Sequence, residues 1–100
     1  VFFISADGDA GLDFLVEKDN SATTTEDVAT MADDTFITVT WFIDPDASKV
    51  YYSVNNAAPV GVVNTNLPDD EELTVSFGIQ NGEAAAKTMT IDYVVAAVER

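Results

Sequence analysis

The stretch Thr35-Phe36-Ile37-Thr38-Val39-Thr40-Trp41-Phe42-Ile43 is the part of the sequence that decides the fold class. Ile, Val, Trp and Ile occupy every second position from residue 37, and Phe and Thr fill the positions between them. A period of two is typical of a strand with two different faces, and β-branched and aromatic residues favour strands. The stretch therefore predicts a central β-strand with Trp41 in the core.

The same alternation recurs along the chain. Leu73–Gln80 alternates Leu, Val, Phe and Ile with Thr, Ser, Gly and Gln, which makes it the clearest strand pattern in the sequence. Thr88–Val98 and Leu12–Glu17 follow the same rule, and Phe2–Ala6 is a shorter candidate. The Thr-rich and acidic stretch Thr23–Met31 predicts either another strand or a short helix.

A hairpin is expected in the middle of the chain. Val50–Val54 and Val60–Asn64 flank Asn55-Asn56-Ala57-Ala58-Pro59, in which Asn favours turns and Pro cannot donate to a strand ladder.

Short strands separated by Gly, Pro, Asn and Asp clusters, such as Asn81-Gly82, predict an all-β antiparallel β-sandwich or jelly roll. A length of 100 residues predicts one domain, residues 1–100, because a chain this short rarely buries two cores. The sequence opens directly on a strand-like run without Met, so we expect a fragment that lacks N-terminal strands.

The charge excludes several classes of partner. Four Lys and Arg against eighteen Asp and Glu give a net charge of −14. Nucleic acid and anionic membranes are therefore poor partners, because both are bound mainly through Lys and Arg. Salt or divalent cations should stabilise so acidic a fold.

Most catalytic chemistry has no candidate residues. The chain contains neither His nor Cys, which excludes Ser-His-Asp and Cys-His constellations within it. Paired carboxylates remain, and the nearest match to the E-x-D-x-E strand motif of jelly-roll glycanases is Glu17-Lys18-Asp19-Asn20-Ser21, where Ser21 replaces the third acid. We therefore expect no enzyme activity, no catalytic residues and no cofactor.

Calcium is the metal that the acidic loops could hold, because it prefers several oxygen ligands. Asp7, Asp9 and Asp13 with Gly8 and Gly11 resemble such a loop, but position five of the EF-hand pattern would be Gly11 and position twelve Lys18. Two further clusters are Asp44 with Asp46, and residues 69–72. Solvated turns are the favoured interpretation of all three, so no metal site is predicted.

Aromatic side chains could stack on sugars. On strands with this alternation an aromatic residue is more often part of the core, which is the interpretation favoured for Trp41. Tyr51 has the opposite parity to Tyr52 and is the better candidate for an exposed ring.

Residues 34–100 resemble a known family. The resemblance rests on the strand and turn signals Asp34-Thr35-Phe36, Val50-Tyr51-Tyr52-Ser53-Val54-Asn55, Val63-Asn64-Thr65-Asn66-Leu67-Pro68, Phe77-Gly78-Ile79-Gln80-Asn81-Gly82 and Thr90-Ile91-Asp92-Tyr93. In these the chain is similar to the C-terminal part of concanavalin A-like jelly-roll proteins of tailed bacteriophage virions, several of which are capsid or head-decoration proteins. Legume-type lectins share that fold, but their metal site uses a His that this chain lacks.

The resemblance implies a viral structural protein on the outer capsid surface, which stabilises the shell or presents an adhesive knob. Its partners would be the capsid protein and copies of itself, and host-surface carbohydrate is a further candidate. The alternative is a carbohydrate-binding, lectin-like module. A glycanase remains only if upstream sequence supplies the missing carboxylate.

An assembling domain should expose apolar side chains that its own sandwich cannot cover. We expect them among Phe36, Phe42, Val94, Val98 and the Tyr51 hairpin. A groove lined by Tyr51, Asn55 and Asn64, with those side chains buried, would instead favour the carbohydrate-binding alternative.

Overall fold

The computed structural model describes residues 1–5, 9–63, 65–68, 70, 72–76, 78–80 and 84–98. These residues form six strands and no helix, which confirms the all-β prediction. The strands are β1 (Phe2–Ile4), β2 (Gly11–Lys18), β3 (Ser21–Thr30), β4 (Val39–Asp44), β5 (Lys49–Val54) and β6 (Val60–Val63). Within the described ranges there is accordingly no helix that could cross a bilayer. Positions used above that lie outside the described residues are Ala6, Asp7, Gly8, Asn64, Asp69, Glu71, Phe77, Asn81 and Gly82.

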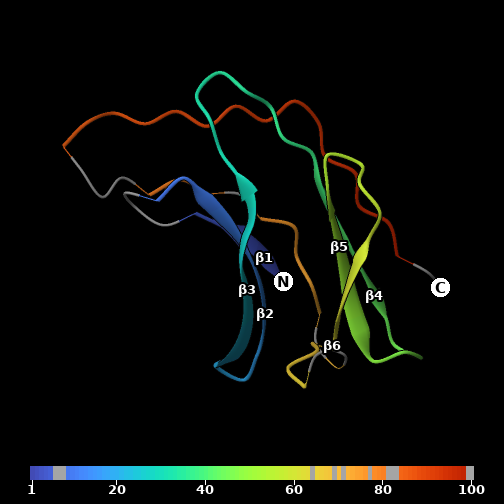
Figure 1. The fold of residues 1–100 in the computed structure, drawn as a ribbon. Coiled ribbons are helices and arrows are strands. Elements are labelled where there is room, and N and C mark those ends of the chain that lie inside the picture. The colour runs from blue at the N-terminus through green and yellow to red at the C-terminus, as the bar shows by residue number, and fades with distance from the viewer. Residues whose placement is uncertain are drawn as a thin grey trace.

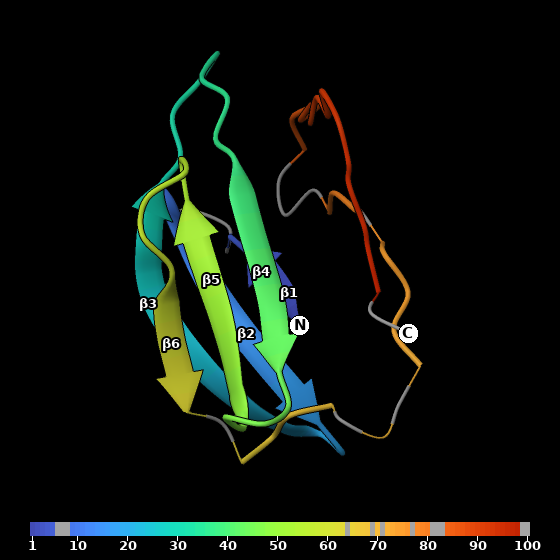
Figure 2. The same ribbon diagram turned by 90° about the vertical axis from the view of Figure 1, so that its right-hand side faces the viewer.

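The strands form two antiparallel sheets of three, in the orders β1-β2-β3 and β4-β5-β6. Figure 1 shows the sheets as two layers, and Figure 2 views them face on, with β5 in front of β2 and β4 on the same side as β1. The two facing layers have the layout of a β-sandwich. Each sheet is a meander, because its strands follow one another in sequence.

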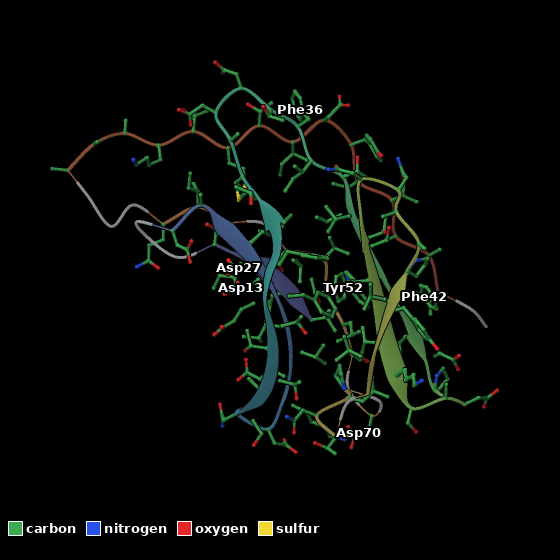
Figure 3. All side chains as sticks on the ribbon, in the orientation of Figure 1. Asp13, Asp27, Phe36, Phe42, Tyr52 and Asp70 are labelled. Atoms are coloured by element: carbon green, nitrogen blue, oxygen red, sulfur yellow. The ribbon has the colours of Figure 1, made fainter. Side chains whose placement is uncertain are left out.

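The core lies between the two central strands. β2 contributes the fully buried Phe14 and Val16, and β5 contributes Val50 and Tyr52. Leu67, which follows β6, closes the core with 6% of its surface exposed. Figure 3 shows Tyr52 between the layers. Every second side chain of β2 and β5 thus points between the sheets, so one face of each sheet is buried against the other.

Two tight turns explain how neighbouring strands pair. Asp19 and Asn20 adopt φ of 51° and 61° between β2 and β3, and Asn55 and Asn56 adopt 51° and 58° after β5. Left-handed conformations at both central residues belong to the type I′ turn, whose twist matches that of paired strands. The predicted hairpin of β5 and β6 is confirmed, with Tyr52 opposite Val60.

The predicted central strand at Thr35–Ile43 is wrong in position. Its ladder begins only at Val39, and β4 pairs with β5 alone, so it is an edge strand. The central place belongs to β5, because β5 is the strand with a hairpin partner on each side.

The two strands predicted near the C-terminus are not formed. The described residues of Leu73–Gln80 and Thr88–Val98 contain neither strand nor helix, and they are exposed. Alternation alone does not form a strand, because a strand also needs a neighbouring strand to pair with, and the described residues of these two segments pair with neither sheet. In contrast, Thr23–Met31 is strand rather than helix, because β3 pairs along β2 from Ser21 to Thr30. Phe2–Ala6 is shortened to β1.

Candidate functional site

A hollow of about 230 Å³ opens on the side of the sandwich where β1 and β4 form the sheet edges. Its lining combines apolar side chains from the two edges with polar ones from β2 and from the segment after Leu67. The lining residues are Val1, Phe2, Glu17, Trp41, Pro68, Glu72, Leu73, Thr74 and Ser76. Figure 2 shows residues 84–98, coloured orange to red, on this side of the molecule and apart from both sheets.

Trp41 reaches the hollow because β4 is an edge. It pairs with Tyr52 across the β4–β5 ladder, so both side chains share the inner face of the sheet. Tyr52 is covered by Phe14 of the facing sheet, whereas 38% of Trp41 remains exposed. The prediction that Trp41 lies in the core is therefore wrong about its burial, although Trp41 does lie on the predicted inner face of the sheet.

Glu17 supplies a carboxylate to the hollow from the end of β2. Glu72 lines the same hollow from a segment 55 residues further along the chain. The α-amino group of Val1 is nearby, and its burial lowers its pKa below the ordinary value, while the negative charge of Glu17 acts in the opposite direction.

The carboxylate motif at Glu17–Ser21 does not lie on one strand face. β2 ends at Lys18, Asp19 and Asn20 form the turn, and Ser21 begins β3. The turn breaks the alternation that would have placed three side chains together, so the motif is the end of a strand and the start of the next. Lys18 also forms an ion pair with Asp70, with Nζ 2.6 Å from Oδ1.

The acidic loops bind their own backbone. Asp9 Oδ1 accepts the Gly11 N–H at 2.8 Å, and Asp44 Oδ1 accepts the Ala47 N–H at 3.0 Å. In both loops a side-chain oxygen replaces a backbone acceptor, as is usual where Asp stabilises a turn.

A β-bulge brings two further acids together. The register shifts between Leu12 and Phe14, and Asp27 on the bulged strand has a φ of 54°. Its N–H donates to Asp13 Oδ1 at 2.9 Å, and Figure 3 shows the two residues side by side. In the part of the chain that the structure describes, no three carboxylates converge to hold a metal ion.

A stacked aromatic pair covers the outer face of the second sheet. Phe42 and Tyr51 lie opposite each other on β4 and β5, with ring centroids 4.8 Å apart and planes within 13°. Tyr51 also lies across Gly61, its partner on β6, where an added Cβ would approach the ring to 2.9 Å. Glycine thus makes room for the Tyr51 ring, which is half-buried, and leaves the Phe42 ring 51% exposed.

The groove that would have favoured the carbohydrate-binding alternative was one lined by Tyr51, Asn55 and Asn64. The hollow described above is lined by neither Tyr51 nor Asn55. Asn55 Oδ1 accepts the Thr38 N–H at 3.1 Å, so its side chain closes the end of the β4–β5 ladder. Asn64 lies outside the described residues.

The predicted exposed apolar side chains are exposed in the isolated chain. Phe36 is 68% exposed, Val94 49% and Val98 85%. Figure 3 shows Phe36 before β4, and Phe42 on the far side of the second sheet from the core. The free edge of β4 and the C-terminal segment therefore carry most of the uncovered apolar surface.

The hollow and these exposed side chains define a two-sheet module with an uncovered side, where the edge strands β1 and β4 lie. The hollow is smaller than the ~300–1,000 Å³ of a usual ligand pocket. Comparison with protein-family models, with curated proteins and with solved structures finds no match to the chain. The resemblance to phage jelly-roll proteins therefore stays a prediction.

Sequence reasoning did not associate Glu72 and Trp41 with Glu17. The three come from β2, β4 and an irregular segment, and no local spacing signals that they meet.

Proposed function

We propose that this domain is a structural module that works by assembling with protein, and that it is not an enzyme. The observation that carries the proposal is the apolar surface of the β4 edge and of residues 84–98, which the chain itself leaves uncovered. Every described residue from 84 to 98 is exposed, and the radius of gyration of 14.3 Å exceeds the ~13 Å typical of a compact 100-residue domain. Large uncovered apolar surface is characteristic of interaction sites.

The site we propose for this activity is the open edge itself. A free strand edge presents unpaired backbone N–H and C=O groups, and natural proteins usually protect such edges. β4 carries Val39, Trp41 and Phe42, and the only charged residue or Pro among residues 39–44 is Asp44 at its end, so residues 39–43 carry none of the side chains that oppose strand addition. A protein partner would satisfy the backbone groups and cover the side chains together.

The particular setting that we propose is the outer surface of a tailed-phage capsid. Its support is the resemblance of residues 34–100 and the net charge of −14, which suits a part that does not touch packaged DNA. In this form of the proposal the assembled domain is a concanavalin A-like jelly roll that reinforces the shell or presents a knob. Residues 73–80 and 88–98 would supply strands beyond the six described.

A carbohydrate-binding role is the second candidate, and the hollow favours it. Trp41 offers a ring for stacking, and Glu17, Glu72 and Thr74 offer hydrogen-bond acceptors or donors beside it. A glycan array separates the two functions: carbohydrate binding predicts a signal that Trp41→Ala abolishes and Phe42→Ala leaves unchanged. Phe42 is the matched control, because it is an exposed aromatic residue on the opposite face of the same strand.

The experiment that tests the proposed function is quantification of this chain in purified particles from its natural source. Mass spectrometry should find it in many copies per particle, retained after washing at low salt. Its absence from particles, with the whole amount in the soluble fraction, would overturn the virion setting.

A further inference from the structure

The β4 edge that faces away from β5 is open along its length. Thr38 directs both its N–H and its C=O toward β5, because its N–H donates to Asn55 Oδ1 and its C=O accepts the Asn55 N–H at 2.8 Å. Backbone groups alternate in direction along a strand, so Val39, Trp41 and Ile43 direct theirs to the free edge. No strand in the described residues pairs there.

Residues 88–98 have the pattern of the strand that this edge lacks. Met89, Ile91, Tyr93 and Val95 alternate with Thr88, Thr90 and Asp92, and the described structure leaves them exposed outside both sheets (Figures 1 and 2). Tyr93 is 64% exposed and Val95 83%. The chain to which this segment belongs therefore does not cover its apolar face.

Charge distinguishes the same segment from the rest of the chain. In residues 84–100 the acids Asp92 and Glu99 are balanced by Lys87 and Arg100, so the whole net charge of −14 lies in residues 1–83. Residues 88–98 carry a single charge, that of Asp92, so this segment adds little to the repulsion between two copies of the acidic chain.

We propose that residues 88–98 of one copy add as a strand to the free edge of β4 in a second copy. This inference rests on the proposed function for its biological setting and names its partner as another copy of this chain. The apolar face of the added strand lies beside Val39 and Trp41 and closes the hollow, while Thr88, Thr90 and Asp92 stay on the outer, solvent-facing side. Reciprocal exchange between two copies gives a closed two-fold pair, the commonest symmetry of homo-oligomers.

The exposed area is sufficient for such a pair. Trp41 and Tyr93 are 38% and 64% exposed, which amounts to ~200 Å² per copy at ~200 Å² for each whole aromatic side chain. Val39, Met89, Ile91 and Val95 are also exposed on this face, and with them the area that both copies lose together reaches about the ~1,000 Å² typical of a specific interface.

Sedimentation of the full chain across a concentration series tests the proposal. We expect a reversible dimer that Ile91→Glu with Tyr93→Glu weakens by about tenfold or more, because both charges would enter a buried interface. The control is Thr88→Glu with Thr90→Glu, which adds the same charge to the outer side and should leave the dimer within about threefold of wild type. Equal weakening by the two variants, or a monomer at every concentration, would overturn the inference.

The edge is tested by a second pair of variants. Val39→Pro removes an N–H that faces the free edge and leaves the β5 ladder intact, so it should abolish the dimer, whereas Val39→Ala should retain it. Circular dichroism confirms that both variants keep the sheets. A dimer unaffected by Val39→Pro would show that strand addition is not its basis.

Disulfide trapping distinguishes addition to a second copy from addition within the same chain. The protein has no Cys of its own, so only introduced cysteines can form a disulfide. Thr40→Cys and Thr90→Cys are made in separate chains, mixed and oxidised, and compared with a chain that carries both. We expect mixed disulfide dimers. A disulfide that forms only within the doubly substituted monomer would place the segment on the β4 strand of its own chain and would overturn the second-copy inference. That result would leave the proposed function untouched, because the analysis of purified particles measures independently whether the chain is a particle component.

Discussion

The rings of Phe14 and Tyr52 lie with their centroids 4.7 Å apart and their planes at 34°, and this contact joins the central strands of the two sheets. Phe3 of β1 packs on both, at 5.0 Å from Phe14 and 6.4 Å from Tyr52. Three aromatic side chains therefore connect the layers at the middle of the core. Among the described residues, the strand side chains that are fully buried all belong to β2 and β5.

Phe14→Ala should destabilise the domain by about 3–5 kcal/mol, because it removes a fully buried ring from a small core. Urea denaturation followed by circular dichroism measures the change in the free energy of unfolding. Phe42→Ala is the control, since that ring is half exposed on the outer face and its loss should cost about 1 kcal/mol. Equal losses would mean that the rings between the sheets do not form the core.

Ser53→Ala should cost about 1 kcal/mol, because the buried Ser53 hydroxyl donates to the Ala57 C=O at 2.7 Å and ties the β5–β6 connection to its strand. Ser5→Ala removes a comparable but exposed bond, from the Ser5 hydroxyl to the Asp9 C=O, and should change stability by less than about 0.5 kcal/mol. The same denaturation measurement compares them. A larger effect at Ser5 would contradict the burial assigned to Ser53.

The sequence was sufficient to predict β2, and the hairpin of β5 and β6. In both places the strand with the period-two pattern is followed by a short turn, so the strand that it pairs with comes next in the sequence. The turn at Asp19-Asn20 was missed, although two adjacent residues that tolerate positive φ are a recognisable signal.

The rest depended on pairing, which alternation does not encode. Thr35–Ile43 has the stronger apolar pattern, yet β5 is central because it has hairpin partners on both sides. Leu73–Gln80 alternates well and still forms no strand in its described residues, because alternation does not determine which strand a segment pairs with. The hollow could not be predicted for the same reason, because Trp41 and Glu72 both line it through the path of the folded chain and not through their spacing in the sequence.

Moderate NaCl should raise the melting temperature, because ions screen the repulsion among charges that sum to −14 over a Debye length of ~10 Å at 0.1 M. Differential scanning calorimetry in dilute and moderate salt measures it. An unchanged or lower melting temperature would contradict the electrostatic account.

Calcium should stabilise no more than NaCl of equal ionic strength, because Asp9, Asp13 and Asp44 already accept backbone N–H groups. The matched comparison uses millimolar CaCl₂ in the same calorimeter. A calcium-specific increase that Asp13→Asn removes would identify a metal site at the bulge.

No turnover is expected from a panel of β-glucans and esters, because the motif at Glu17–Ser21 is broken by a turn. Glu17→Gln and Glu72→Gln are the informative variants, since both side chains line the hollow. Turnover by the wild type that either variant abolishes would show that these carboxylates are catalytic.

Backbone hydrogen exchange of this chain, free and in its assembled particle, tests most directly whether it works by assembling with protein. Our account predicts that the amides of Val39, Trp41 and Ile43, which face the open edge, exchange rapidly in the free chain and are strongly protected in the assembly, together with residues 88–98. The amides of Phe14 and Leu15 in β2, which have strands on both sides, should change little and serve as the internal reference. Equal exchange at the β4 edge in the two states would contradict the claim that protein assembly covers this surface.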